Sequence, residues 1–291
     1  MLVTGARGFL GSRLMPALAA AGANAHAFQG DVTDAAAVRA AVAAVRPHVV
    51  YHMAAYGTTP VQCDEARMRD VNVGGIARVW EAIDALPCRI VQTGTCAEYG
   101  PAAGPLREDH VCRPETAYPQ TVHEAVLFSL DRARRTGREL IVLRPFGPYG
   151  PADRPERLVP HVIDGLLSGG RVAVTTGEQR RDYSYVDDHV RALMLAGGGS
   201  LTDLPAVFNI GSGGPIRVRT LVETIASVVG ADAIARVDFG AVPWRATDSS
   251  DMFADIGAAR RVLGYEPRVA LEDGLSRTVA WHRTARAEAA R

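Results

Sequence analysis

The chain has 291 residues with 32 acidic and 32 basic side chains, so its formal net charge is zero. This balance argues against nucleic acid or an anionic membrane as the main partner, because both attract strongly basic surfaces. A hydrophobic content of 47% fits a globular protein with one large α/β domain, or a large domain carrying a smaller lobe. Lysine is absent, so every one of the 32 basic residues is arginine.

Metal, disulfide and membrane signals are missing. The four cysteines form no CxxC pair and no short cluster with histidine, so we expect neither a disulfide framework nor a metal site. No apolar run approaches about 18 residues, and the chain does not start with a basic region followed by an apolar stretch. We therefore expect a cytoplasmic protein without a membrane partner.

Short apolar strands alternate with helices through the first half of the chain. Strands are predicted at 1–4, 23–28, 48–53, 89–93 and 139–143. Helices are predicted at 11–21, from about 35 to just before Pro47, at 69–85 and at 118–135. This alternation implies right-handed crossovers and a parallel, doubly wound sheet.

The texture changes after Pro148, where proline, arginine and glycine become frequent. Helices are predicted at 158–168 and 186–196, a strand at 172–175, and a flexible glycine connector at 197–199. The C-terminal Ala/Arg-rich tail is predicted to be a frayed helix. We expect residues 151–291 to form mainly a smaller lobe that closes over the sheet and is interleaved with its last strands.

A glycine-rich turn joins the first strand to the first helix, with the sequence Thr4-Gly5-Ala6-Arg7-Gly8-Phe9-Leu10-Gly11. Gly5 allows a tight turn, Gly8 lets the backbone approach a pyrophosphate, and Gly11 lets the helix lie close to the sheet. The helix N-terminus adds N–H donors and a positive dipole end. The strand-to-helix context supports dinucleotide binding, so we expect residues 1–150 to form a Rossmann-type dinucleotide-binding domain.

The second strand leaves the choice between NAD and NADP open. An Asp or Glu about 20 residues after the turn would bind the adenosine ribose of NAD. This strand ends instead at Phe28-Gln29-Gly30-Asp31. Gln29 can hydrogen-bond a ribose hydroxyl but does not repel a 2′-phosphate, and Arg7 and Arg13 can attract one.

Further segments carry a family resemblance. They are Gly30-Asp31-Val32-Thr33-Asp34, Met53-Ala54-Ala55 after the fourth strand, Val71-Asn72-Val73, Thr93 to Gly100, Tyr118 at a helix start, Leu143 to Pro151, Arg181 to Asp188, Phe208 to Gly211 and Leu263 to Pro267. With the glycine turn, they resemble the extended short-chain dehydrogenases/reductases, the NAD-dependent epimerase/dehydratase family that acts on nucleotide sugars. The resemblance covers nearly the whole chain.

The resemblance implies two sets of binding residues. Those for the cofactor are Thr4, Gly5, Arg7, Gly8, Phe9, Leu10, Gly11, Gln29, Asp31, Val32, Met53, Ala54, Ala55, Asn72 and Pro145. Those for the substrate are Tyr56, Cys96, Gly147, Arg181 and Arg245. The two arginines resemble those that contact the sugar nucleotide's phosphates, while Gly147 stands where many members have an asparagine.

Family members use a tyrosine as proton donor or acceptor at the sugar oxygen, and a serine or threonine hydrogen-bonds that oxygen. A lysine four residues after the tyrosine binds the nicotinamide ribose and lowers the tyrosine pKa, because a nearby cation favours the phenolate. Tyr118 and Thr95 match the first two residues, but Val122 occupies the lysine position.

Two interpretations of this departure remain. His123 lies five residues after Tyr118, roughly 140° away around a helix, and joins the site only if the helix start is kinked near Pro119. Either Thr95, Tyr118, water and His123 form an unusual proton relay, or the redox chemistry has been lost or changed. Cys96-Ala97 replaces the Asp-Glu pair of the dehydratases, which disfavours dehydration.

Three functions follow from these observations. The first is an NAD(P)-dependent oxidoreductase or epimerase acting on a nucleotide-activated keto-deoxy sugar, with 4-ketoreduction as the best guess. The second is a tailoring enzyme that acts on another small metabolite without net redox, and the third is a non-catalytic dinucleotide-binding protein. By analogy with the family, we expect a homodimer in which helices 69–85 and 118–135 form a four-helix bundle.

Overall fold

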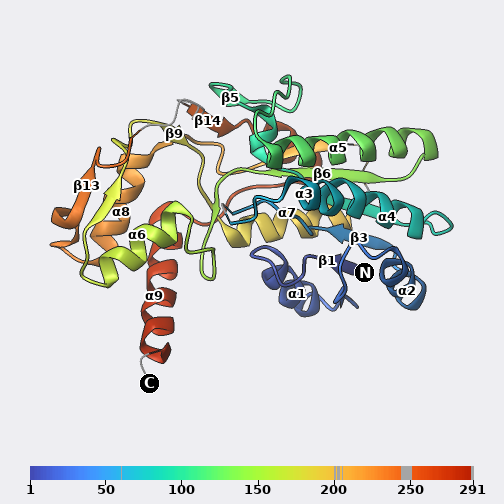
Figure 1. The fold of residues 1–291 in the computed structure, drawn as a ribbon, viewed down its shortest axis with the longest axis horizontal. Coiled ribbons are helices and arrows are strands. Elements are labelled where there is room, and N and C mark those ends of the chain that lie inside the picture. Colours follow the sequence, from blue (N-terminus) through green and yellow to red (C-terminus); the bar gives the residue numbers. More distant parts are fainter. Residues whose placement is uncertain (60, 200, 202–203, 205, 244–250, 290–291) are drawn as a thin grey trace.

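The computed structural model describes residues 1–59, 61–199, 201, 204, 206–243 and 251–289. Its centre is a six-stranded sheet in the order β11-β6-β4-β3-β1-β2, and all neighbouring strands are parallel (Figure 1). The strands are β1 (Leu2–Thr4), β2 (His26–Ala27), β3 (Val49–His52), β4 (Arg89–Thr93), β6 (Leu140–Pro145) and β11 (Ala206–Ile210). The predicted doubly wound α/β fold is confirmed.

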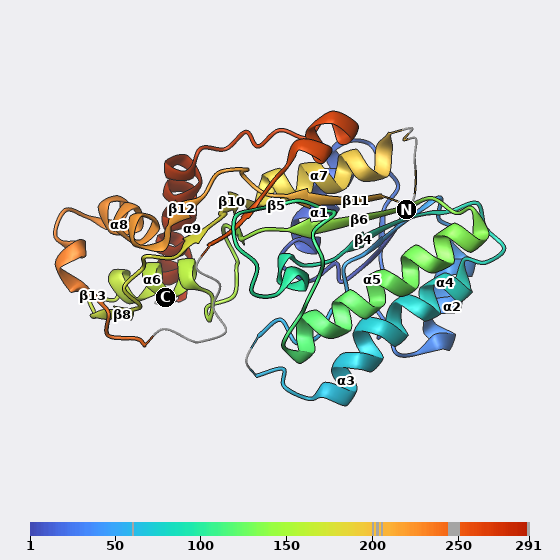
Figure 2. The same ribbon diagram turned by 90° about the horizontal axis from the view of Figure 1, so that it is seen from above.

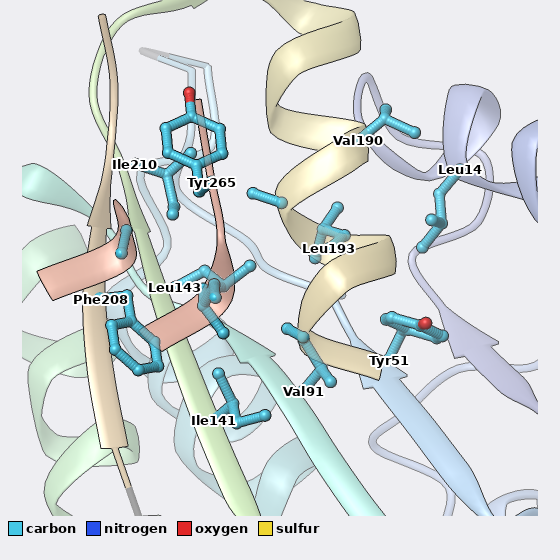
Figure 3. Close-up of a cluster of buried hydrophobic side chains, with 14 of the residues drawn as sticks. Leu14, Tyr51, Val91, Ile141, Leu143, Val190, Leu193, Phe208, Ile210 and Tyr265 are labelled. Atoms are coloured by element: carbon cyan, nitrogen blue, oxygen red, sulfur yellow. The ribbon is translucent and has the colours of Figure 1, made fainter. Parts of the chain in front are cut away.

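Helices cover both faces of this sheet (Figures 1 and 2). One face carries α2 (Ala35–Val45), α4 (Gly75–Ala82) and α5 (Ala117–Thr136), and the other carries α1 (Gly11–Ala20) and α7 (Val186–Gly198). Figure 3 shows the apolar cluster on the α7 face, where Leu193 packs among Tyr51, Val91 and Ile141 of the sheet. Burial on both faces explains why the strands are continuous apolar runs.

A second group of elements lies beyond one end of the sheet, on the left in Figure 1. Its helices are α6 (Leu158–Leu167), α8 (Val218–Val229) and α9 (Leu271–Ala289), and β8 (Val172–Val174) pairs with β13 (Val237–Phe239). A separate buried cluster that includes Val162, Leu221 and Leu275 holds these elements together. The assignment of residues 151–291 to a substrate-binding lobe stays a prediction.

Short strands connect the two parts. β7 (Pro148–Tyr149) pairs with β10 (Ser184–Tyr185). A second small sheet has the order β12-β9-β14-β5, with strands β12 (Ile216–Arg217), β9 (Arg180–Arg181), β14 (Asp251–Ala254) and β5 (Pro105–Leu106). Because β11 returns to the central sheet after α7, the C-terminal half of the chain contributes to both parts. No helix in the described part of the chain is long and apolar enough to cross a membrane.

The helix predicted at 69–85 starts earlier and is interrupted. It is observed as α3 (Glu65–Arg69), a π-helical turn at Asp70–Gly74, and α4. The Asp64 side chain accepts a hydrogen bond from the Arg67 amide at 3.0 Å, which fixes the earlier start. The π-helical turn contains Asn72, whose side chain is bonded to the loop after β3. Such turns are frequent at functional sites.

Two further expectations need correction. Gly197 and Gly198 belong to α7 rather than to a flexible connector. A β-carbon at Gly197 would lie 1.9 Å from the Tyr51 hydroxyl, so the glycine allows close packing of this helix on β3. Met53-Ala54-Ala55 follows the third strand rather than the fourth, because the chain passes directly from β2 into α2 through the N-cap Asp34.

Candidate active site

The glycine turn is shaped by close backbone packing. Gly5 has φ of 67°, and a β-carbon there would lie 2.6 Å from the Met53 carbonyl carbon. A β-carbon at Gly11 would lie 2.2 Å from the Gly5 carbonyl oxygen. At Gly8 the nearest atom would be the Gly5 oxygen, at 3.2 Å. Sterics therefore require glycine at the first and last positions, while Gly8 faces more open space.

The start of α1 is suited to an anion. Its N-cap residue, Leu10, makes no side-chain cap hydrogen bond, and the first turn contains no acidic residue. A diphosphate can therefore accept hydrogen bonds from the amides at the helix N-terminus and be stabilised by the helix dipole. This helix start without a side-chain cap and the glycine turn fit the diphosphate of a dinucleotide.

A first cavity of about 420 Å³ opens beside this turn. Most of the predicted cofactor residues line it, namely Gly5, Arg7, Gly8, Gln29, Asp31, Val32, Met53, Ala54 and Ala55. Tyr56, which we expected to contact substrate, also lines this cavity, and the Arg67 guanidinium lies 5.3 Å from its ring centre. The cavity lies at the carboxyl ends of β1 and β3, where the strand order reverses, as expected for a ligand site in an open α/β sheet.

Two predicted cofactor residues support the wall of this cavity from behind. The Thr4 hydroxyl accepts hydrogen bonds from the Met53 and Ala54 amides at 3.2 and 3.3 Å. The Asn72 side chain accepts from the Tyr56 amide and donates to the Tyr56 carbonyl, both at 2.9 Å. Thr4 and Asn72 are not among the cavity's lining residues, so they position the segment 53–56.

A second cavity of about 360 Å³ adjoins the first. The two share five residues: Gly5, Gly8, Met53, Ala55 and Arg154. Thr95 from the end of β4 and Tyr118 from the start of α5 line the second cavity together with Val122. The predicted residues Phe9, Leu10, Gly11, Cys96, Pro145 and Gly147 line it as well. Tertiary folding thus brings the predicted tyrosine and threonine to one cavity.

Thr95 is fixed by a capping box. It begins a short 3₁₀ helix at Cys96–Tyr99, and its hydroxyl accepts a hydrogen bond from the Ala97 amide at 3.3 Å. In return, the Glu98 carboxylate accepts from the Thr95 amide at 2.9 Å. Burial raises the pKa of the neighbouring Cys96 thiol to about 11, so this side chain is an uncharged thiol at neutral pH.

Tyr118 is a neutral phenol. Burial, followed by the nearby Cys96, raises the pKa of Tyr118 to about 12. Arg157 and Arg154 act in the opposite direction but do not outweigh burial. At neutral pH, Tyr118 can therefore donate a proton or a hydrogen bond far more readily than it can accept a proton.

His123 takes part in a network behind Thr95. Its Nδ1 lies 3.1 Å from a Glu98 carboxylate oxygen that also accepts from Arg144 at 2.9 Å. Cys112, followed by Glu98, raises the pKa of His123 to about 9. Burial would raise the pKa of Glu98, but the hydrogen bonds from His123 and Arg144 hold it below its usual value. His123 is not among the residues that line the second cavity, and its catalytic role stays a prediction.

Glu98, Cys112 and His123 also place three potential metal-ligand atoms within 4.8 Å of one another. The Arg144 guanidinium already binds the Glu98 carboxylate, and both side chains are almost completely buried. A cation added at this point would face the positive charge of Arg144. The cluster therefore fits a structural hydrogen-bond network better than a metal site.

Gly147, Arg181 and Arg245 were predicted to bind substrate, but the structure does not bring all three to the second cavity. Gly147 has φ of 39°, and a β-carbon there would lie 2.1 Å from the Asp182 carbonyl oxygen, so asparagine does not fit in this backbone arrangement. Arg181 donates to the Arg180 carbonyl at 2.9 Å and lines neither cavity. Arg245 lies outside the described residues.

Three ionisable residues of the second cavity were missed by sequence reasoning: Asp153, Arg154 and Arg157. All lie between β7 and α6, in the segment where the amino-acid composition changes and proline, arginine and glycine become frequent. Burial raises the pKa of Asp153, while Arg157 acts against this rise. The composition of the segment was a signal, but composition does not show which side chains reach a cavity.

Comparisons with known proteins agree with this geometry. Residues 1–211 match the family model of the NAD dependent epimerase/dehydratase family. The chain is 30% identical to a UDP-glucose 4-epimerase of Mycolicibacterium smegmatis, over 97% of this chain and 98% of that protein.

Two solved structures are similar over nearly the whole chain. The UDP-glucose 4-epimerase of Thermotoga maritima, solved with UDP-glucose, has a TM-score of 0.89 and 28% identity over 98% of each chain. The dTDP-glucose 4,6-dehydratase of Streptomyces venezuelae, solved with NAD, has a TM-score of 0.85 and 26% identity over 99% of this chain and 98% of that one.

The chain therefore belongs to the NAD-dependent epimerase/dehydratase family of extended short-chain dehydrogenases/reductases. The predicted family is confirmed, as is a nicotinamide dinucleotide as the cofactor, with NAD and NADP both open. The family and these relatives also indicate an enzyme, and the relatives named here are enzymes of UDP-glucose and dTDP-glucose.

Proposed function

We propose that the protein reduces the 4-keto group of a nucleotide-linked keto-deoxy sugar. The supporting observation is that Tyr118 is a neutral phenol in a cavity where Val122 replaces the usual lysine. A neutral phenol is suited to protonate the oxygen that forms when a ketone accepts hydride.

The residues present divide this reaction between them. A bound reduced nicotinamide supplies the hydride. The hydroxyls of Tyr118 and Thr95 hydrogen-bond the ketone oxygen, and Tyr118 transfers its proton to that oxygen as the carbonyl is reduced. The resulting phenolate recovers a proton from water. The glycine turn and the start of α1 hold the cofactor diphosphate, so that binding and proton transfer involve different elements.

Other family reactions fit these side chains less well. Dehydration requires an acid and a base, but Cys96 is an uncharged thiol and Ala97 cannot exchange a proton. Epimerisation begins with removal of a proton from a hydroxyl, which a phenol with a pKa of about 12 performs poorly. Epimerisation remains the second candidate because curated relatives are named as sugar 4-epimerases.

The test is oxidation of NADH and NADPH by a panel of sugar nucleotides, including a dTDP-4-keto-6-deoxy sugar and UDP-glucose. We expect loss of absorbance of the reduced cofactor, with one reduced sugar formed for each cofactor oxidised. Interconversion of UDP-sugars without net cofactor consumption would establish epimerisation instead. Cofactor binding without either reaction would favour the tailoring or the non-catalytic alternative.

We also propose a homodimer formed through the helices predicted at 69–85 and 118–135, now α4 and α5. The supporting feature is an exposed apolar surface on α5, where Leu127 is 53% and Phe128 is 37% accessible. Buried contacts between such helices stabilise four-helix bundles. Sedimentation of the intact protein and of a Leu127→Asp variant tests this, since only the variant should be monomeric at micromolar concentration.

A further inference from the structure

The second cavity contains an apolar side chain at the position of the family's lysine. Val122 lies four residues after Tyr118 on α5, and both line the cavity. Val122 is 5% exposed, so it is packed into the wall. It cannot donate to a ribose hydroxyl and carries no charge to stabilise the tyrosine oxygen. Any positive charge at this site must come from another element.

The segment between β7 and α6 supplies such charge. Among the described residues, the cationic side chains that line the second cavity are those of Arg154 and Arg157. Arg157 faces a carboxylate, since its Nε lies 3.7 Å from Asp153 Oδ2, and it lines only the second cavity. Arg154 lines both cavities, so it lies at their junction and shares the second cavity with Tyr118.

The charge of Arg154 is also less neutralised than that of Arg157. Its guanidinium donates to the hydroxyl of Thr58, which is uncharged. Within the described residues, no carboxylate forms an ion pair with Arg154. The Asp153 carboxylate accepts from the backbone amide of Arg154 at 2.9 Å, which orients the residue; the charge of Arg154 also lowers the pKa of Asp153, but less than that of Arg157 does. Arg154 can therefore direct its charge toward a ligand.

The segment is held against the glycine-turn region. The Arg13 guanidinium, from α1, donates to the Pro151 carbonyl at 3.0 Å, and the Asp153 amide donates to the Gly150 carbonyl at 3.2 Å. Between them, Ala152 has φ of 63°, a left-handed conformation that is unfavourable for a residue with a β-carbon. Strained backbone of this kind persists when surrounding contacts over-determine it, and it is frequent at ligand sites.

We propose that Arg154 replaces the missing lysine: its guanidinium binds the nicotinamide ribose of the cofactor and supplies the positive charge beside Tyr118. This inference rests on the proposed function, because it assigns a cofactor-binding and proton-positioning role within that site. The electrostatics agree in direction, since Arg154 lowers the pKa of Tyr118 against the effect of burial. Arg157 lowers it more strongly, but its charge is shared with Asp153.

The experiment compares the wild type with Arg154→Gln, Arg154→Lys, Arg157→Gln, Val122→Lys and the double variant Arg154→Gln/Val122→Lys. The first readout is the dissociation constant for NADH and NADPH, measured by fluorescence without substrate. The second is the ionisation of Tyr118, followed by near-ultraviolet absorbance against pH with the Tyr118→Phe protein subtracted. Circular dichroism and thermal melting identify any variant that fails to fold.

We expect Arg154→Gln to weaken cofactor binding about tenfold and to raise the Tyr118 pKa, while Arg154→Lys retains most of the binding. Arg157→Gln should change cofactor binding less. Val122→Lys should strengthen cofactor binding far more in the Arg154→Gln background than in the wild type. In that background the new lysine alone binds the nicotinamide ribose, whereas in the wild type it would compete with Arg154 for the same ribose.

The inference is overturned if Arg154→Gln binds both reduced cofactors as the wild type does, or if Val122→Lys has the same effect in both backgrounds. If Arg154→Gln raises only the KM for the sugar nucleotide and leaves cofactor binding unchanged, Arg154 binds the substrate's phosphates. That result would also overturn the inference. The failure of the proposed function has a different signature, because then the wild type itself would oxidise neither NADH nor NADPH. If Arg154→Gln does not fold, Arg154→Met takes its place in both the single and the double variant, and the same outcomes decide the question.

Discussion

The first cavity, beside the glycine turn, and the second cavity, around Tyr118, share five residues but have different kinds of wall. The first is shaped by backbone packing, because a β-carbon at Gly5 would lie 2.6 Å from the Met53 carbonyl carbon, and one at Gly11 would lie 2.2 Å from the Gly5 carbonyl oxygen. The second depends on which side chains project into it. Its wall contains Tyr118 and Thr95, which match the predicted family pattern, and Val122, Gly147 and Cys96, which differ from the residues that the resemblance leads us to expect.

This contrast has a physical reason. Binding a diphosphate at a helix N-terminus uses amides that every sequence possesses, so only the absence of side chains has to be conserved. Proton transfer uses one side chain whose pKa depends on all its neighbours, so a single replacement such as valine for lysine changes the chemistry. A chain can therefore keep its cofactor site while its reactive site is rebuilt.

The strongest test of the glycine turn, which borders both cavities, is Gly11→Val. Its β-carbon would lie 2.2 Å from the Gly5 carbonyl oxygen, so the turn and α1 must separate, at a cost of about 5 kcal/mol. Thermal melting and NADH binding should both show the loss. Gly198→Ala is the matched control, because a β-carbon at this exposed helical glycine meets nothing within 4 Å. A Gly11→Val protein that binds NADH normally would contradict a backbone-determined site.

The second cavity is tested by Tyr118→Phe. Removing the hydroxyl should lower the rate of sugar reduction about a thousandfold, or about 4 kcal/mol, while leaving NADH binding nearly unchanged. Steady-state rates and fluorescence binding provide the two measurements. Undiminished turnover would remove Tyr118 from the reaction, and a parallel loss of cofactor binding would mean that the two cavities are not functionally separable.

The support behind Thr95 is tested by Glu98→Ala. This substitution leaves the buried Arg144 without its carboxylate, so we expect a loss of about 3 kcal/mol in the free energy of unfolding. Asp273→Ala, which breaks an exposed pair with Arg277, should cost less than about 0.5 kcal/mol. Urea denaturation of both variants provides the comparison. Equal losses in the free energy of unfolding for the two variants would show that the buried Glu98–Arg144 pair behind the second cavity stabilises the fold no more than an exposed ion pair does.

The smallest effect is a pH dependence at His123. Cys112 and Glu98 raise the pKa of His123 to about 9 in the folded protein. Protonated His123 therefore stabilises the fold, and this contribution is complete below the pKa of histidine in the unfolded chain, about 6.5. That stability is lost as the pH rises through 9. His123→Gln should therefore destabilise the protein by about 1 kcal/mol more at pH 6 than at pH 10, after allowance for solvent screening.

His26→Gln, at an exposed strand residue, is the control for this titration. Urea denaturation of the wild type and both variants at the two pH values gives the required differences. If the free energies of unfolding of the wild type and His123→Gln differ by the same amount at both pH values, the raised pKa of His123 is contradicted. The electrostatic link of His123 with Glu98 would then be contradicted as well.

The strands and most helices were predictable because local signals agreed with the tertiary fold. β4 was predicted at its observed bounds, and α5 within one residue at each end. The errors occurred where tertiary contacts overrode local chemistry. Gly197 appeared to be part of a flexible linker, but it is the residue that lets α7 approach Tyr51. The π-helical turn around Asn72 likewise depends on contacts with a separate loop.

The sequence predicted some of the residues that line the second cavity and missed others. Tyr118 and Thr95 were identified by motif, and the structure brings them to one cavity. Asp153, Arg154 and Arg157 carried no motif in our reading, and their position depends on the path of the segment after β7. His123 and Arg181 are near in sequence to site residues, yet they line neither cavity.

The sequence by itself determined the parallel α/β fold, the glycine-rich turn and the presence of valine four residues after Tyr118, because each follows from periodicity or from residue identity at a fixed spacing. Only the tertiary structure decided which charges surround Tyr118 and how strongly burial holds its proton. These quantities depend on side chains from the short 3₁₀ helix after β4, from α5 and from the β7–α6 segment, whose distances in space are not encoded by their spacing along the chain.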